Sequence, residues 1–110
     1  MRTADLPARS LLLIAALSLG MPVLAAETTI TQTHKTFDPD VITVQAGDVL
    51  HFENDDDVKH NIQVTDANDV TQDLGLQKPG ETVTQAFQAP GEYRVHCSIH
   101  PKMRLRVLVQ

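Results

Sequence analysis

A two-residue alternation of apolar and polar side chains runs through most of this 110-residue chain, in short segments separated by glycine and proline. Successive side chains of a strand point to opposite faces of a sheet, so this period predicts strands with one buried face. Short strands separated by turns at intervals of about 8–12 residues are typical of an antiparallel sandwich or barrel. The expected strands are 41–45, 50–54, 62–64, 81–88, 93–97 and 105–109.

Turn sequences mark the ends of these segments, and no segment shows a convincing helical period. Residues 65–73 form a polar stretch, and 67–74 is the only segment with any helical character. The length suits one compact domain and leaves no room for a second core. The turns combine residues that favour tight bends, and they are Ala46-Gly47-Asp48, Lys78-Pro79-Gly80 and Ala89-Pro90-Gly91.

The first 26 residues resemble an export signal more than part of a fold. Arg2 and Arg9 give a positively charged start, the apolar run 11–19 follows, and small residues lie at 25–26. The apolar run is much shorter than the roughly 20 residues that a membrane-spanning helix needs. An uncleaved membrane anchor is the alternative. We expect export to the periplasm without membrane insertion.

Cleavage is expected before Ala26 or before Glu27, which makes 27–110 the single domain. The leader takes two positive charges and one negative charge from the 9 Lys+Arg and 14 Asp+Glu of the chain, which leaves 7 and 13 and a net charge of −6. An acidic domain is not expected to bind nucleic acid, because non-specific binding needs a basic footprint. A monomer is the default expectation.

Cys97 is the only cysteine of the chain, so it has no disulfide partner within it. In an oxidising compartment such a thiol is open to oxidation unless it is buried or bound to a metal. His100 and Met103 follow it at steps of three residues, and His60 lies upstream after an acidic loop. A thiolate, two imidazoles and a weak thioether suit copper in both oxidation states. Zinc is disfavoured, because a thioether is a poor zinc ligand.

Three pieces of the sequence together indicate a family. The upstream half of the domain reads Phe37-x-Pro39-x-x-Ile42-x-Val44-x-x-Gly47-Asp48-x-Leu50-x-Phe52-x-Asn54. The pair His60-Asn61 follows, and Cys97-x-x-His100-x-x-Met103 comes near the end. With these pieces the chain resembles the cupredoxins, the small blue copper proteins, over essentially all of 27–110. The last spacing is most similar to that of the amicyanins, because plastocyanins and pseudoazurins have more residues between the histidine and the methionine.

The resemblance implies a Greek-key β-sandwich of seven or eight strands that binds one copper ion. It also implies that the backbone N–H of Asn61 points at the Cys97 sulfur, and that the Asn61 side chain ties two loops together near Ser98. Two positions depart from the family pattern: His96 stands where plastocyanins have a tyrosine, and Arg104 stands where a glycine is frequent. The implied copper ligands are His60, Cys97 and His100 in the equatorial plane and Met103 on the axis.

Each of these residues also has a plain structural interpretation. Cys97 could be a small core residue, the two histidines could be surface residues, and Met103 could fill a gap in the core. The acidic run 55–57 is expected to be a solvated loop. The remaining histidines are not expected to be ligands, since two of them alternate away from inward-facing residues; they are His34, His51 and His96.

The donor set and the resemblance predict a periplasmic type 1 copper protein that shuttles one electron between partners through Cu(I) and Cu(II). The main alternative is a copper storage or delivery protein of the same fold, because both roles use histidine and sulfur ligands. A cysteine-nucleophile enzyme is a further alternative, although no oxyanion arrangement is visible in the sequence. We expect the protein itself not to be an enzyme.

The partners are expected to be redox proteins that dock transiently near the edge of His100. A c-type cytochrome and a periplasmic dehydrogenase are the two classes considered, and the resemblance to amicyanins raises methylamine dehydrogenase as a donor. The negative net charge favours a basic partner. The docking end could still be locally positive, because four basic residues lie next to ligands in the sequence: Lys59, Lys102, Arg104 and Arg106.

Overall fold

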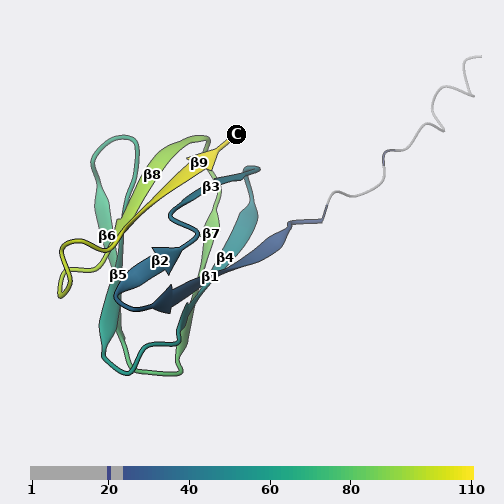
Figure 1. Ribbon diagram of the computed structural model, residues 1–110. Helices are drawn as coiled ribbons and strands as arrows, with labels where there is room; N and C mark the ends of the chain where they lie inside the picture. Colours follow the sequence, from purple (N-terminus) through teal and green to yellow (C-terminus); the bar gives the residue numbers. More distant parts are fainter. Residues whose placement is uncertain (1–19, 21–23) are drawn as a thin grey trace, which may run out of the picture.

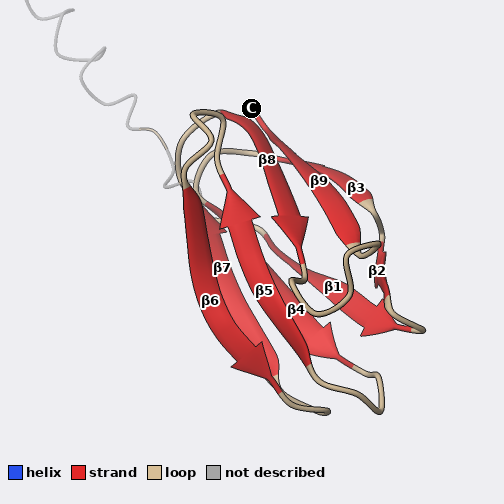
Figure 2. Ribbon diagram, turned by 90° about the vertical axis from the view of Figure 1, so that its left-hand side faces the viewer, coloured by secondary structure: helices blue, strands red, loops and turns tan. Residues whose placement is uncertain are grey.

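The part of the chain that the structure describes forms nine β-strands, in two sheets packed face to face (Figures 1 and 2). The computed structural model describes residue 20 and residues 24–110, and no helix occurs among them. The predicted all-β sandwich is confirmed, with nine strands in place of the expected seven or eight. The strands are β1 (Glu27–Thr33), β2 (Thr36–Asp38), β3 (Val41–Val44), β4 (Asp48–Asn54), β5 (His60–Thr65), β6 (Thr71–Gln77), β7 (Thr82–Phe87), β8 (Gly91–His96) and β9 (Arg104–Val109).

Both sheets are mixed. The strand order is β2-β1-β4-β7 in one sheet and β3-β9-β8-β5-β6 in the other. β1 runs parallel to β4 and β3 runs parallel to β9, whereas the remaining neighbours are antiparallel. The expectation of an antiparallel sandwich is therefore wrong for these two pairs. The chain leaves the first sheet after β2 and returns to it after β3, so β4 enters beside β1 in the same direction.

The core lies between the sheets and is built from alternate residues of the strands. On β4 the side chains of Leu50, Phe52 and Asn54 are buried, and the residues between them are only partly buried. Phe37 packs edge to face on Phe52, with ring centroids 6.3 Å apart. The buried apolar residues of the core are Ile30, Phe37, Val44, Leu50, Phe52, Ile62, Val64, Phe87, Val95, Cys97, Met103, Leu105, Val107 and Val109.

Three strands were not predicted, and each has a weak hydrophobic period. β1 is rich in threonine and buries only Ile30 and Gln32. β2 is three residues long. β6 lies at the edge of the five-stranded sheet with most of its side chains exposed. The polar stretch 65–73 is therefore in part a strand, and the helical character considered for 67–74 is wrong.

Several loops that are far apart in sequence meet at one end of the sandwich. Strands β1, β4, β6 and β8 end there, and β5, β7 and β9 begin there (Figure 2). The register shows this directly, since Gln32 lies beside Asn54 and His60 lies beside Gln77. The loops that meet at this end, called the loop end below, are 34–35, 55–59, 78–81 and 97–103.

The predicted leader, residues 1–26, falls almost entirely outside the described residues, so its role as an export signal stays a prediction. Strand β1 begins at Glu27, next to the expected cleavage point. Among the described residues, none belongs to a helix with the length and apolar character that crossing a membrane requires.

A pair of leucine substitutions tests the assignment of the core. Leu50 is fully buried on β4, so Leu50→Ala leaves a cavity and should lower the free energy of unfolding by about 2–5 kcal/mol. Leu76 on β6 is 66% exposed and is the matched control, so Leu76→Ala should change that free energy by less than about 0.5 kcal/mol. Urea denaturation measures both, and equal losses would contradict the assigned core.

Candidate metal centre

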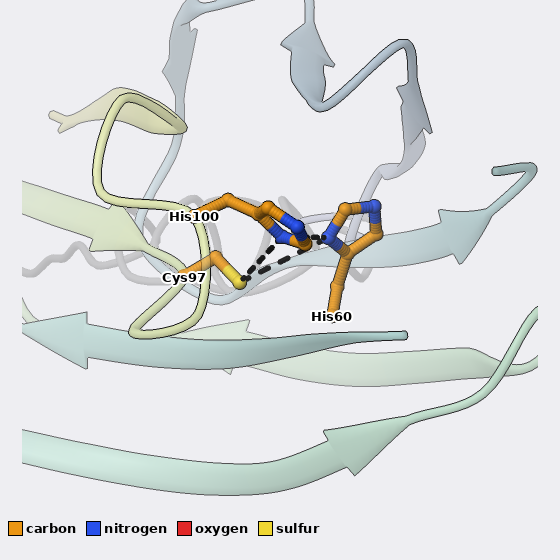
Figure 3. A group of neighbouring side chains, drawn as sticks. All are labelled: His60, Cys97 and His100. Carbon is orange, nitrogen blue, oxygen red and sulfur yellow. Dashed lines mark hydrogen bonds between the residues drawn. The ribbon is translucent and has the colours of Figure 1, made fainter. Parts of the chain in front are cut away.

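His60, Cys97 and His100 bring three donor atoms together at the loop end (Figure 3). His60 is the first residue of β5, and the other two lie in the loop between β8 and β9, which we call the ligand loop (97–103). The His60 Nδ1 lies 3.1 Å from the His100 Nδ1. The Cys97 Sγ lies 3.9 Å from the His60 Nδ1 and 3.8 Å from the His100 Nδ1. The fold thus joins two predicted ligands to a third that is 37 positions upstream of the cysteine.

These separations fit a single bound ion. Metal bonds of about 2.0–2.1 Å to nitrogen and about 2.3 Å to sulfur allow two donors of one ion to lie as much as about 4 Å apart. A neutral imidazole nitrogen without a proton presents a lone pair, so two such atoms at 3.1 Å call for a proton or a cation between them. One cysteine and two histidines are the donor set of trigonal copper sites. The cluster is therefore positioned as a possible site for one copper ion.

Burial and one carboxylate fix the ring of His60. The ring is fully buried, and its Nε2 lies 2.8 Å from the Oδ2 of Asp56, so its Nδ1 faces the other donors. The Asp56 side chain is only 12% exposed, whereas Asp55 and Asp57 on either side are exposed. Asp56 was not among the predicted site residues, because all three aspartates were expected to be solvated. Its position four residues before His60 is the one signal in the sequence that could have found it.

The ionisation states around the cluster favour metal binding. Desolvation raises the pKa of Asp56, but hydrogen bonds from two backbone amides and from the His60 ring outweigh it, and the pKa lies below its ordinary value. Burial lowers the pKa of His100, and repulsion from Lys35 and from any protonated form of His60 lowers it further, against the opposite effect of Asp56. At neutral pH the carboxyl is therefore charged and the His100 ring is neutral, as a ligand must be.

Asn61 joins the two segments that carry the donors. Its backbone N–H donates to the Cys97 Sγ at 3.4 Å. Its side-chain Oδ1 accepts hydrogen bonds from the Ser98 N–H at 2.6 Å and from the Ser98 hydroxyl at 2.9 Å. Its Nδ2 donates to Asp73 on β6 at 3.2 Å, which orients the amide. The contacts that the resemblance implied for Asn61 are confirmed.

The two sulfur-containing residues among the predicted ligands, Cys97 and Met103, are both buried in the core, each with 1% of its surface exposed. Cys97 is a free thiol. The Met103 N–H donates to the His100 carbonyl at 2.9 Å, in a turn that leads the chain into β9. Met103 is therefore the last residue of the ligand loop and belongs to the core cluster that also contains Cys97. Its assignment as the axial ligand stays a prediction.

The other three histidines lie outside the cluster of donors. The ring of His51 on β4 bonds the Thr84 hydroxyl at 2.8 Å and the Glu27 carboxylate at 2.6 Å. His96 is partly exposed at the end of β8, and His34 lies in the turn between β1 and β2. None of these three histidines belongs to the group of donor atoms.

A groove opens beside His100, the one member of the cluster that is partly exposed. The groove has a volume of about 530 Å³ and lies between the β1–β2 turn and the ligand loop. Through this groove, residues of the ligand loop, which carries two of the three donors, are accessible to solvent and to a docking molecule. Its lining residues are His34, Lys35, Thr36, His100, Pro101 and Lys102.

Sequence relatives cover most of the domain. A methylamine utilization protein MauL from Methylophilus methylotrophus is 36% identical over 81 residues, which are 72% of this chain and 47% of that protein. This chain thus spans about half the length of that relative. MauL from Methylorubrum extorquens is 29% identical over 88 residues, 80% of this chain and 77% of that protein. Plastocyanin from Ulva arasakii is 33% identical over 84 residues, 67% of this chain and 86% of that protein.

Solved structures share the fold. A purple cupredoxin from Nitrosopumilus maritimus has a TM-score of 0.67 and 24% identity, over 76% of this chain and 99% of that chain. The reduced Cu(I) form of an amicyanin mutant at pH 4 has a TM-score of 0.71 and 21% identity, over 80% of this chain and 86% of that chain. Residues 10–109 match the family described as the cupredoxin-like domain. The chain therefore belongs to the cupredoxin-like family.

Proposed function

We propose that this protein is a periplasmic type 1 copper electron carrier, which exchanges one electron at a time with redox partners. The observation that carries the proposal is the convergence of one buried thiol and two imidazole nitrogens, with no pair more than 3.9 Å apart, in a cupredoxin fold. The plastocyanin and MauL relatives support the same class of function.

Four side chains would hold the copper in this proposal. The Nδ1 atoms of His60 and His100 and the Cys97 thiolate would be the three principal donors, and the Met103 thioether would be a weak fourth donor. Soft sulfur favours Cu(I) while imidazole also suits Cu(II), so the bound ion supplies a reversible one-electron couple.

The contribution of the protein is to hold its donors in place. Movement of ligands between oxidation states adds to the barrier for electron transfer, so a preorganised site is faster. His60 begins a strand and is bonded to Asp56, and the loop of Cys97 is tied to β5 by Asn61. Both segments are anchored in the same five-stranded sheet, because His60 begins β5 and the ligand loop joins β8 to β9. This arrangement favours a carrier that changes little on oxidation.

Burial of the donors favours electron transfer over the two alternatives. His60 is 0% exposed and Cys97 is 1% exposed, so another protein or a substrate has no direct access to them. A copper delivery protein needs donors that exchange metal, and a nucleophilic cysteine needs an accessible thiolate. An electron can instead pass through the partly exposed ring of His100.

The charge of the groove beside His100 supports an acidic docking face on the partner. The chain as a whole carries a net charge of −5, yet Lys35 and Lys102 face each other across the groove beside His100. No acidic residue lines that groove. The loops at this end hold four lysines and four acidic residues, so the positive charge is confined to the groove; the residues are Lys35, Lys59, Lys78, Lys102, Asp55, Asp56, Asp57 and Glu81.

The partner in this proposal is a c-type cytochrome or a periplasmic dehydrogenase that docks transiently at the groove. The names of two relatives, methylamine utilization proteins, support a dehydrogenase that oxidises a small amine as the electron donor. A small docking area suits fast turnover, because weak electron-transfer complexes bury less than about 1,200 Å². A monomer suffices for this role.

The optical spectrum of the copper-loaded protein tests the ligand assignment. The Cu(II) form should show an intense blue band from thiolate-to-copper charge transfer. Cys97→Ser should abolish this band even where copper still binds, because a serine oxygen does not supply the transition. His96→Ala is the control, since it removes the adjacent side chain but no donor, and it should keep the band. A band retained in Cys97→Ser would remove the cysteine from the site.

Voltammetry tests the axial ligand and the carrier function together. Met103→Gln should lower the reduction potential, because an oxygen donor stabilises Cu(II) more than a thioether does. Val107→Ala, which also loosens the buried core but removes no donor, should leave the potential nearly unchanged. An unchanged potential in Met103→Gln would count against Met103 as a ligand. Loss of copper on repeated cycling of the wild type would favour delivery over electron transfer.

Small redox probes of opposite charge test the docking proposal. Hexacyanoferrate(III) should oxidise the reduced protein more slowly in Lys102→Glu than in the control Lys78→Glu, because Lys102 lines the groove and Lys78 does not. The difference should disappear at high salt, where charges are screened. The cationic tris(phenanthroline)cobalt(III) should show no such loss in stopped-flow measurements. Equal rates for the two variants with hexacyanoferrate(III) would contradict a positively charged docking site at the groove.

A further inference from the structure

We propose that Asp56 is the positioning residue of the copper centre: its carboxylate holds the His60 ring so that Nδ1 faces the metal, and its charge tunes the metal through that ring. This inference rests on the proposed copper function. It concerns a residue that was not among the ligands predicted from the sequence.

One carboxylate makes three hydrogen bonds. The Asp56 Oδ2 lies 2.8 Å from the His60 Nε2. The same carboxylate accepts the N–H of His34 on Oδ1 at 2.9 Å and the N–H of Lys35 on Oδ2 at 2.8 Å. The side chain is 12% exposed and the His60 ring is fully buried, so little water competes for these bonds. Asp56 thus connects the β1–β2 turn to a candidate ligand on β5.

The β1–β2 turn is shaped to receive this carboxylate. His34 and Lys35 both have left-handed backbone conformations, with φ of 52° and 57°. Residues other than glycine rarely adopt the left-handed backbone region, so two such residues in succession need a compensating interaction. Consecutive N–H groups in a turn can form an anion-binding concavity. Here both groups donate to Asp56, which supplies that interaction.

The backbone of Asp56 is fixed from the other side. Its N–H donates to the side-chain Oδ1 of Asn54 at 2.9 Å. Asn54 is fully buried and its Nδ2 donates to the carbonyls of Val58 at 2.9 Å and Gln77 at 3.2 Å. The carboxylate is therefore held at both its backbone and its oxygens. This is the arrangement expected of a positioning group and not of a solvated loop residue.

The chemical effect follows from the position of the proton. A carboxylate accepts a hydrogen bond, so the proton of the neutral His60 ring sits on Nε2 and the lone pair on Nδ1 points to Cys97 and His100. A carboxylate bonded to a ligating histidine fixes its tautomer and raises its basicity. A more basic imidazole stabilises Cu(II) more than Cu(I). Asp56 therefore lowers the reduction potential.

Asp57 provides a matched control for Asp56. It lies one residue further along the same acidic loop, its side chain is exposed, and no side-chain hydrogen bond of Asp57 occurs in residues 24–110. Asp57→Asn removes one negative charge near the site, as Asp56→Asn does, but leaves the bonds to His60 and to the turn intact. The difference between the two variants isolates the positioning effect from the loss of charge.

The reduction potential and the copper affinity test the proposal on the copper-loaded protein. Asp56→Asn should raise the potential above that of Asp57→Asn and weaken copper binding by about 10–100-fold, the usual loss when such a partner of a ligand is removed. Asp56→Glu keeps the charge and the acceptor, so its potential should lie closer to that of the wild type. Equal potentials and equal affinities in Asp56→Asn and Asp57→Asn would overturn the proposal.

Nitrogen NMR of the metal-free protein separates this proposal from the proposed function. The His60 ring should be the Nε2–H tautomer in the wild type and in Asp57→Asn, and a mixture of tautomers in Asp56→Asn. An Nδ1–H tautomer of His60 in the wild type would overturn the positioning role, even where Asp56→Asn fails to fold. A wild type that shows the expected tautomer but binds no copper would instead refute the proposed function and leave the Asp56 contact standing.

Discussion

The geometry of the donor set depends on the link that Asn61 makes between β5 and the ligand loop. Its amide oxygen accepts two hydrogen bonds from Ser98, and its N–H donates to the Cys97 sulfur. These bonds fix the distance between the segment that carries His60 and the segment that carries the other donors. Since each bond joins residues at least 36 positions apart, only the folded sandwich brings them together. A metal centre built in this way gains its rigidity from the fold, without a disulfide.

The loop end combines buried donors with a charged and accessible rim. His60 and Cys97 are shielded in the core, while the partly exposed His100 borders a groove with lysines on both sides. The β1–β2 turn contributes twice, because its amides bind Asp56 while its residues line the groove. Shielding, an exit for the electron and a docking surface are thus provided by neighbouring residues. This combination suits a carrier that meets its partners briefly.

The sequence predicted the strands whose hydrophobic period is strong and missed those whose period is weak. β4 and β9 alternate clearly because each has one face in the core. β1 is rich in threonine, and β6 is an edge strand with exposed side chains, so neither buries enough apolar residues to give a signal. The parallel pairing of β1 with β4 also lies beyond local patterns, since it depends on how the chain crosses between the sheets.

The candidate site was predictable to a similar extent. The spacing of Cys97, His100 and Met103 within one loop could be recognised from the sequence, and the resemblance added His60 and Asn61. The role of Asp56 was missed, because three consecutive aspartates look alike in sequence and the bend of their loop buries the middle one; its position four residues before His60 was the one signal. The local positive charge of the groove was likewise hidden by the negative charge of the whole chain.

A crystal structure of the copper-loaded protein, with anomalous diffraction recorded at the copper absorption edge, would show which atoms bind the metal. We expect one copper ion bonded to the His60 Nδ1, the Cys97 Sγ and the His100 Nδ1. Copper found elsewhere, or bound at the loop end without a bond to the Cys97 sulfur, would contradict it.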